Sequence, residues 1–162
     1  MPDIPAVGRR RGLGYDRRMT DGPDIALSGA AAFRHARACH DHLAGALGIR
    51  LYDSLRGRGF LADGAAGPDL TPAGEDFVTG FGIDLAALRR GRVRLCRDCL
   101  DCSGRRNHLG GSLGRALLAR IGDLGWARRP AHGRAVLFSP AGERAFRDAF
   151  PVPALETSSS AP

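Results

Sequence analysis

Cysteine and histidine residues at the spacing of zinc ligands are the feature of this sequence that points most directly to chemistry. Two residues separate Cys96 from Cys99, which is the spacing of a zinc-binding pair. Cys39 and His42 are three residues apart and would share one face of a helix. The set Cys39, His42, Cys96 and Cys99 would supply three thiolates and one imidazole. Zinc, or another thiophilic metal, binds such a set tetrahedrally.

The same residues allow other interpretations. His108 lies nine residues after Cys99 and competes for the fourth ligand position. One alternative is that the thiols respond to oxidants or thiophilic compounds. Another is that they are ordinary buried or half-exposed cysteines. Cys102, three residues after Cys99, adds the option of a disulfide within residues 96–102. His42 and His108 would alternatively brace a turn by bonding to backbone groups.

Signatures of catalysis are missing from the sequence. It contains no Ser-His-Asp order, no phosphate-binding glycine loop and no HExxH pair. No βαβ pattern surrounds Cys96-x-x-Cys99, which argues against a redox enzyme. The pair Asp98 and Asp101 does not form a convincing acid–base dyad. We therefore expect a protein that is not an enzyme.

An internal repeat indicates how these residues are positioned. Residues 42–48 read HLAGALG and residues 108–114 read HLGGSLG. Residues 71–75 read TPAGE and residues 139–143 read SPAGE. Between these motifs the residues Leu51, Leu55, Gly59 and Phe60 match Leu117, Ile121, Gly125 and Trp126. The repeat predicts two copies of one unit that pack against each other.

The first unit has the element order of a winged helix. Residues 33–47 are predicted to form an amphipathic helix that Gly48 ends, followed by a second short helix over residues 49–55. Residues 60–70 are predicted to form a hairpin. Thr71 then caps a third helix, with a proline at its first position.

The second unit has a clearer hairpin, with arms at residues 126–129 and 135–138, after which Ser139 caps the last helix. The predicted fold is therefore α+β and mostly helical, with two tandem winged-helix-like repeats and short β-hairpins. The repeats are expected to span residues 33–90 and 91–150. They are expected to lie between a disordered segment, residues 1–32, and a flexible tail, residues 151–162.

Positive charge is concentrated in the second unit. The chain has a net charge of +7, and all 24 of its basic residues other than histidine are arginine. Residues 89–150 hold 14 of them against 5 acidic residues. This bias suits contact with a polyanion such as DNA, although a solvated arginine-rich face is the alternative. The candidate nucleic-acid-binding residues are Arg115, Arg120, Arg128, Arg129 and Arg134.

The expected location is the cytoplasm. No apolar run approaches the ~20 residues that span a bilayer. The arginines at positions 9–11 are not followed by the apolar segment of a secretory signal. In a reducing compartment the four cysteines are expected to be thiols or metal ligands rather than disulfides.

The segments 33–45 (FRHARACHDHLAG) and 96–109 (CRDCLDCSGRRNHL), together with the two Ser/Thr-Pro-Ala-Gly motifs, resemble ArsR-type bacterial transcriptional regulators. The resemblance covers residues 33–150. It implies a homodimeric, DNA-binding winged helix-turn-helix regulator, or the dimerisation and effector-sensing part of one. In that family a DNA-reading domain precedes this region, and residues 1–32 are too short to form it. The family pattern also has tryptophan at the position of Cys102. The alternative is a small zinc-binding or protein-interaction module without DNA binding.

Overall fold

Short antiparallel hairpins alternate with helices in the computed structural model, which describes residues 29–102 and 105–153. The helices are α1 (Gly29–His35), α2 (Gly45–Gly57), α3 (Pro72–Gly80), α4 (Leu85–Arg90), α5 (Gly111–Asp123) and α6 (Pro140–Ala149). The strands are β1 (Arg37–Cys39), β2 (His42–Ala44), β3 (Leu61–Gly64), β4 (Gly67–Leu70), β5 (Arg97–Leu100), β6 (Asn107–Gly110), β7 (Ala127–Arg128) and β8 (Leu137–Phe138). The α+β class with short hairpins is therefore confirmed.

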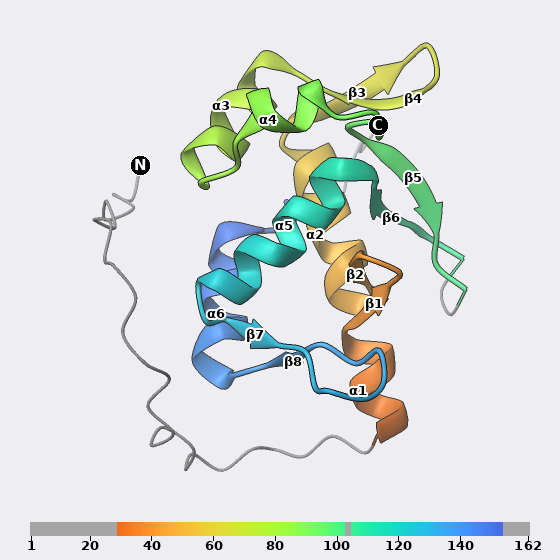
Figure 1. The fold of residues 1–162 in the computed structure, drawn as a ribbon, viewed down its shortest axis with the longest axis vertical. Helices are drawn as coiled ribbons and strands as arrows, with labels where there is room; N and C mark the ends of the chain where they lie inside the picture. The colour runs from red at the N-terminus through yellow and green to blue at the C-terminus, as the bar shows by residue number, and fades with distance from the viewer. Residues whose placement is uncertain (1–28, 103–104, 154–162) are drawn as a thin grey trace, which may run out of the picture.

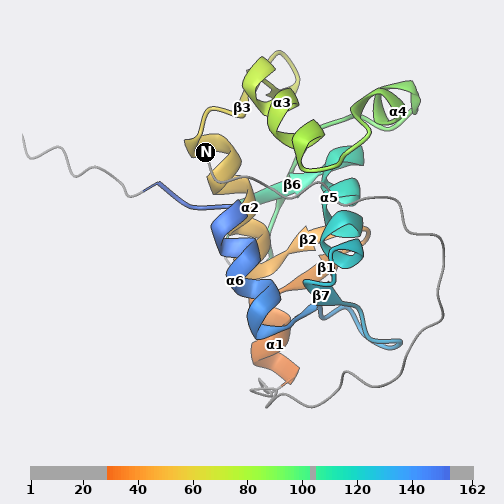
Figure 2. The ribbon, with the colours of Figure 1, turned by 90° about the vertical axis from the view of Figure 1, so that its left-hand side faces the viewer.

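Hairpin, helix, hairpin, helix is the order of elements in residues 37–80 and again in residues 97–149, here called the first and second halves. Helices α2 and α5 cross at the centre of the molecule (Figure 1), with α3, α4 and β3–β4 at one end and α1 and β7–β8 at the other. Each central helix packs on a strand of the other half, because α2 contacts β6 and α5 contacts β2. Figure 2 shows these two strands between the two helices. The first hairpins of the two halves are thereby brought together.

The core is built around the apolar rows of the two central helices. Leu51 and Leu55 of α2 are buried, as are their sequence matches in α5, Leu117 and Ile121. Burying each such side chain contributes roughly 1.5–3 kcal/mol relative to leaving it in water. Aromatic side chains close the core beside these helices through ring contacts among Phe77, Phe81, Phe138, Phe146, Phe150 and Trp126.

The predicted helix over residues 33–47 is wrong. Helix α1 ends at His35, the β1–β2 hairpin follows, and α2 begins only at Gly45. Gly45 has φ +80°, and a Cβ there would lie 2.8 Å from the carbonyl oxygen of Arg34. This positive φ and close backbone approach interrupt the helix and are accessible to glycine. Gly48 does not end a helix either, because it lies inside α2.

The hairpins after the central helices and the caps that follow them are confirmed. In β3–β4, Leu61 pairs with Leu70, and in β7–β8, Ala127 pairs with Phe138. The Thr71 side chain accepts a hydrogen bond from the backbone N–H of Gly74 at 3.1 Å, and Ser139 caps α6 in the same way. The predictions for the two ends of the chain can be compared with the structure only in part. Helix α1 starts inside the segment 1–32 expected to lack structure, while residues 1–28 and 154–162 lie outside the described residues.

Replacing either cap residue by alanine is expected to destabilise the protein, by about 1 kcal/mol for Ser139→Ala. Thr71→Ala should cost more, because the Thr71 hydroxyl also donates a 2.7 Å hydrogen bond to the carbonyl oxygen of Gly59. Urea denaturation of both variants measures the difference. Equal losses would show that the second hydrogen bond contributes nothing.

Candidate metal centre

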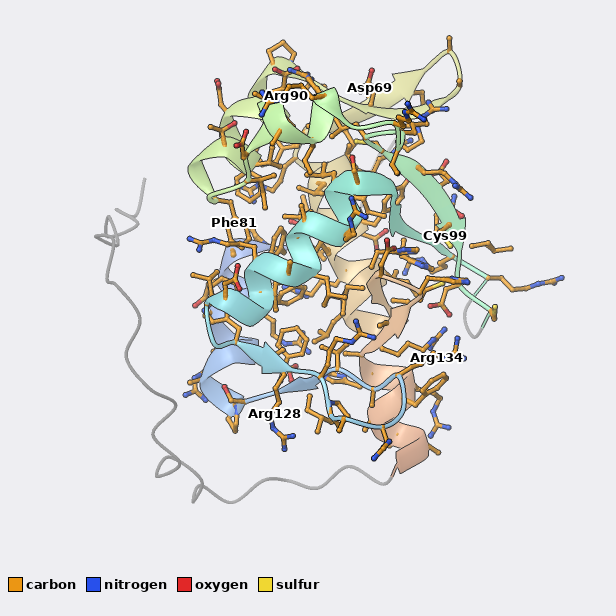
Figure 3. All side chains as sticks on the ribbon, in the orientation of Figure 1. Asp69, Phe81, Arg90, Cys99, Arg128 and Arg134 are labelled. Carbon is orange, nitrogen blue, oxygen red and sulfur yellow. The ribbon has the colours of Figure 1, made fainter. Side chains whose placement is uncertain are left out.

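Two cysteines and two histidines from the first hairpin of each half form the candidate site. In β1–β2, Cys39 is the cross-strand partner of His42, and in β5–β6, Cys99 is the cross-strand partner of His108. Strands β2 and β6 contact each other, which brings the two pairs together. Figure 3 labels Cys99 on the hairpin that reaches along the edge of the molecule. Each half therefore contributes one thiol and one imidazole.

The donor atoms have the separations of a tetrahedral metal site. The Sγ atoms of Cys39 and Cys99 are 3.9 Å apart, and the Nε2 atoms of His42 and His108 are 3.1 Å apart. All four donor atoms lie within 4.8 Å of one another. Zinc bonds of ~2.3 Å to sulfur and ~2.0–2.1 Å to nitrogen, at tetrahedral angles, require separations of ~3.8 Å between sulfurs and ~3.3 Å between nitrogens. These two separations differ from the tetrahedral values by only a few tenths of an ångström. The separations between sulfur and nitrogen lie within 4.8 Å, against the ~3.6 Å of an ideal site, so the hairpins would close slightly around an ion.

Aspartates lie beside the far nitrogens of both imidazoles. Nδ1 of His42 is 3.2 Å from Oδ1 of Asp41. Nδ1 of His108 is 4.0 Å from Oδ2 of Asp101, beyond hydrogen-bond distance, and has no hydrogen-bond partner among the described residues. Metal-binding histidines characteristically donate this second N–H to a carboxylate. The Nε2 atoms of His42 and His108 face each other at 3.1 Å, which is hydrogen-bond distance. In the metal-free protein one ring can donate to the other, and a bound cation would take the place of the shared proton.

Asp101 also ties the two halves together beneath the site. Its Oδ1 accepts a 2.7 Å bond from the guanidinium of Arg37, and its Oδ2 accepts a 3.0 Å bond from the backbone N–H of Gly45. Both Asp101 and Arg37 are buried. This buried pair fixes the first hairpin and the start of α2 against the segment that follows β5.

Burial sets the protonation of the site when no metal is bound. Burial, together with the neighbouring His42, lowers the pKa of His108 to about 4. Burial also raises the pKa of the Cys99 thiol to about 11, with Cys39 as the next cause. At neutral pH the His108 imidazole is therefore neutral and available as a ligand, whereas the Cys99 proton must be released when a metal binds.

Metal-free protein is expected to lose stability as the pH falls from 6.5 to about 4. Unfolded His108 protonates near its ordinary value of 6.5, but the folded protein holds its pKa at about 4. The unfolded state binds more protons in this window, so the stability present above pH 6.5 is lost as the pH falls. Urea denaturation across the window measures the slope. A slope that is equally steep in His108→Gln would assign it to other groups.

Cys96 lies apart from the cluster, in which His108 is the fourth donor. Cys96 is 1 % exposed, and burial raises the pKa of its thiol to about 12. Cys96 precedes β5, and its sulfur is not among the four donor atoms that gather within 4.8 Å. Cys102 is exposed, and all four cysteines are free thiols. Sequence reasoning did not predict that Asp41 and Asp101 lie beside the imidazoles. The only indication in the sequence was that each is within two residues of a candidate ligand.

The candidate nucleic-acid-binding arginines lie on α5 and on the β7–β8 ribbon. Arg115, Arg128, Arg129 and Arg134 are exposed. Figure 3 labels Arg128 and Arg134 on this ribbon, and the Arg134 guanidinium lies 5.5 Å from the ring centre of Phe33. Arg120 instead donates a 2.9 Å hydrogen bond from Nε to the carbonyl oxygen of Phe81. Four of the five side chains are therefore exposed to solvent, and one braces the fold.

Fold and site together define an α+β protein with a two-thiol, two-imidazole centre between its halves. Over 111 residues the chain is 37 % identical to the HTH-type transcriptional regulator YdfF of Bacillus subtilis (strain 168), a protein that is itself uncharacterised. The match covers 68 % of this chain and 49 % of YdfF, so the chain spans about half the length of the relative it matches. No family model and no solved structure matches the chain.

The similarity is to a regulator of transcription and not to an enzyme, in agreement with the expectation from the sequence. It supports the helix-turn-helix class of regulator in general. Among the described residues, the structure contains no helix long and apolar enough to cross a membrane.

Proposed function

We propose that this chain is the metal-binding part of a helix-turn-helix transcriptional regulator, and that Cys39, His42, Cys99 and His108 together hold one zinc ion. The observation that carries the proposal is the gathering of two sulfur and two nitrogen atoms within 4.8 Å, with S–S and N–N separations close to those of a tetrahedral site. Two thiolates with two imidazoles suit zinc, whereas magnesium and calcium prefer oxygen ligands. Four protein ligands leave no open position for a substrate, so the ion's role is structural or regulatory.

The origin of the ligands suggests how the metal acts. Each half supplies one cysteine and one histidine, so an ion bound by all four joins the two halves. The free energy of metal binding then stabilises the packing of β1–β2 against β5–β6. Metal occupancy would therefore bias the arrangement of the halves, which is what a metal-responsive regulator requires.

DNA binding is the second part of the proposal. It is supported by the similarity to a transcriptional regulator and by the exposed arginines of the β7–β8 ribbon. The proposal includes the ArsR-type assignment, the tandem winged-helix-like repeats over residues 33–90 and 91–150, a homodimeric assembly and a cytoplasmic location. A reducing cytoplasm keeps the two thiols available as metal ligands.

Metal analysis of the purified chain tests the zinc site. We expect about one zinc per chain, lost in Cys39→Ser and Cys99→Ser because each change removes a thiolate. Cys96→Ala and Cys102→Ser are matched cysteine controls outside the cluster and should retain the ion. Zinc retained in Cys99→Ser, or lost in Cys102→Ser, would contradict this assignment.

Retardation of DNA separates the regulator from a zinc module that does not bind DNA. We expect binding that weakens steeply with salt, because arginine–phosphate contacts release counterions. Arg128→Ala/Arg129→Ala should weaken it more than Arg56→Ala/Arg89→Ala, which removes the same charge from arginines already paired with Asp63 and Glu75. Bound zinc without any retardation would favour the module. Equal effects of the two double variants would exclude the ribbon as the DNA contact.

A further inference from the structure

A hollow of about 370 Å³ lies between α5 and the β7–β8 ribbon, and none of the four candidate metal ligands lines it. From α5 it is lined by Arg115, Leu118, Ala119 and Gly122. These positions are three, four and seven residues apart and therefore form one face of the helix. The ribbon side includes residues 127–129. The volume lies within the range of small-molecule sites, ~300–1,000 Å³.

The floor of the hollow is apolar and contains free space. Leu118 and Val136 line it and are almost fully buried, being 7 % and 2 % exposed. Gly122 faces the same space, and a Cβ built there meets no atom within 4 Å. A short hydrocarbon group would therefore find an apolar surface at this place without displacing the protein's own side chains.

Three arginines surround this apolar floor. Within the described part of the chain, no carboxylate pairs with Arg115, Arg128 or Arg129, whereas Arg37, Arg56, Arg89, Arg106 and Arg147 all form ion pairs. The one acidic residue of the lining, Asp41, is already engaged with Nδ1 of His42 at 3.2 Å. The rim therefore carries excess positive charge that an anionic ligand would neutralise.

We propose that the hollow binds a small organic carboxylate, with its hydrocarbon body on Leu118 and Val136 and its carboxylate among Arg115, Arg128 and Arg129. The guanidinium fork matches a carboxylate in shape and charge. An apolar floor or a cationic rim alone would not select such a molecule. The two side by side favour a ligand that has both a hydrocarbon body and a negative charge. The site uses none of the four proposed zinc ligands, and Asp41, which contacts His42, is the one lining residue that also borders the metal centre.

Calorimetric titration of the full chain with octanoate tests the site, with octanol as the neutral analogue of the same length. We expect octanoate to bind with a stoichiometry near one per chain and octanol to bind at least tenfold more weakly. Gly122→Leu fills the hollow and should weaken octanoate at least tenfold. Gly80→Leu is the matched control, because a Cβ at Gly80 also meets nothing within 4 Å but lies at the end of α3.

The Arg115→Ala variant tests whether this arginine binds a carboxylate or DNA. We expect its affinity for octanoate to fall at least tenfold. Absence of octanoate binding to the wild-type chain, or equal binding by the Gly122→Leu variant, would overturn the inference. The inference would also be overturned if octanoate does not bind the wild-type chain and Arg115→Ala abolishes DNA retardation. The arginines would then bind nucleic acid rather than a carboxylate. Repeating the titration with zinc-loaded and chelator-treated protein keeps this result distinct from failure of the metal proposal.

Discussion

Asp101→Ala is expected to lower the free energy of unfolding by about 3–5 kcal/mol, because it leaves the buried guanidinium of Arg37 without its partner. The same change removes the acceptor of the Gly45 N–H bond and the carboxylate nearest to Nδ1 of His108. Zinc affinity should therefore fall by about 10–100-fold, as it does when an outer partner of a metal ligand is lost. Chemical denaturation and competition with a chelator measure the two effects separately.

Asp63→Ala is the matched control, since it breaks an ion pair with Arg56 in which the aspartate is 85 % exposed. Its cost should stay below about 1 kcal/mol, as is usual for surface pairs. Adding Arg37→Met to Asp101→Ala should restore part of the lost stability by removing the unpaired charge. Equal losses for Asp101→Ala and Asp63→Ala would show that the buried pair does not hold the halves together.

Gly114→Ala is expected to destabilise the protein by at least the ~1–3 kcal/mol typical of an overpacked core. A Cβ at Gly114 would lie 2.2 Å from the carbonyl oxygen of Leu109 and 3.2 Å from the Cβ of His42. The turn from β6 into α5 must therefore move, and His42 moves with it. We expect weaker zinc binding as well as a lower midpoint of denaturation.

Gly122→Ala tests the same substitution on the same helix where space is free. A Cβ there meets nothing within 4 Å, and replacing a helical glycine by alanine typically stabilises by about 0.5–1 kcal/mol. Gly48→Ala provides the counterpart in the first half, where a Cβ would lie 2.5 Å from the carbonyl oxygen of Leu43. Similar stabilities of Gly114→Ala and Gly122→Ala would contradict the close approach seen at Gly114.

Local chemistry explains the features that sequence reasoning predicted. Thr71 and Ser139 cap their helices through hydrogen bonds that span only three residues, and the hairpins that precede them join neighbouring segments. The repeated HLxGxLG motif also has a local meaning. Its fourth residue, Gly45 in the first copy and Gly111 in the second, has a positive φ where a strand turns into a central helix. Such effects depend on residues close in the chain, so the sequence displays them.

The metal ligands could not be predicted correctly from local sequence patterns. Spacing alone grouped Cys96 with Cys99, but Cys96 is buried in the hydrophobic core and lies outside the cluster. The β1–β2 hairpin was hidden because its residues have helical spacing, whereas the positive φ of Gly45 and its approach to the carbonyl of Arg34 interrupt that helix. Neither effect can be read from a window of neighbouring residues.

By itself, the sequence determined the cysteines and histidines available for a site, the caps, the later hairpins and the leucine rows of α2 and α5. Only the tertiary structure decided that Cys39, His42, Cys99 and His108 meet, and that Asp41 and Asp101 stand behind the imidazoles. The reason is that β2 packs beside β6, and each contacts the central helix of the other half. Such contacts join residues about 60 positions apart, as with Cys39 and Cys99, and they follow from the collective packing of the core.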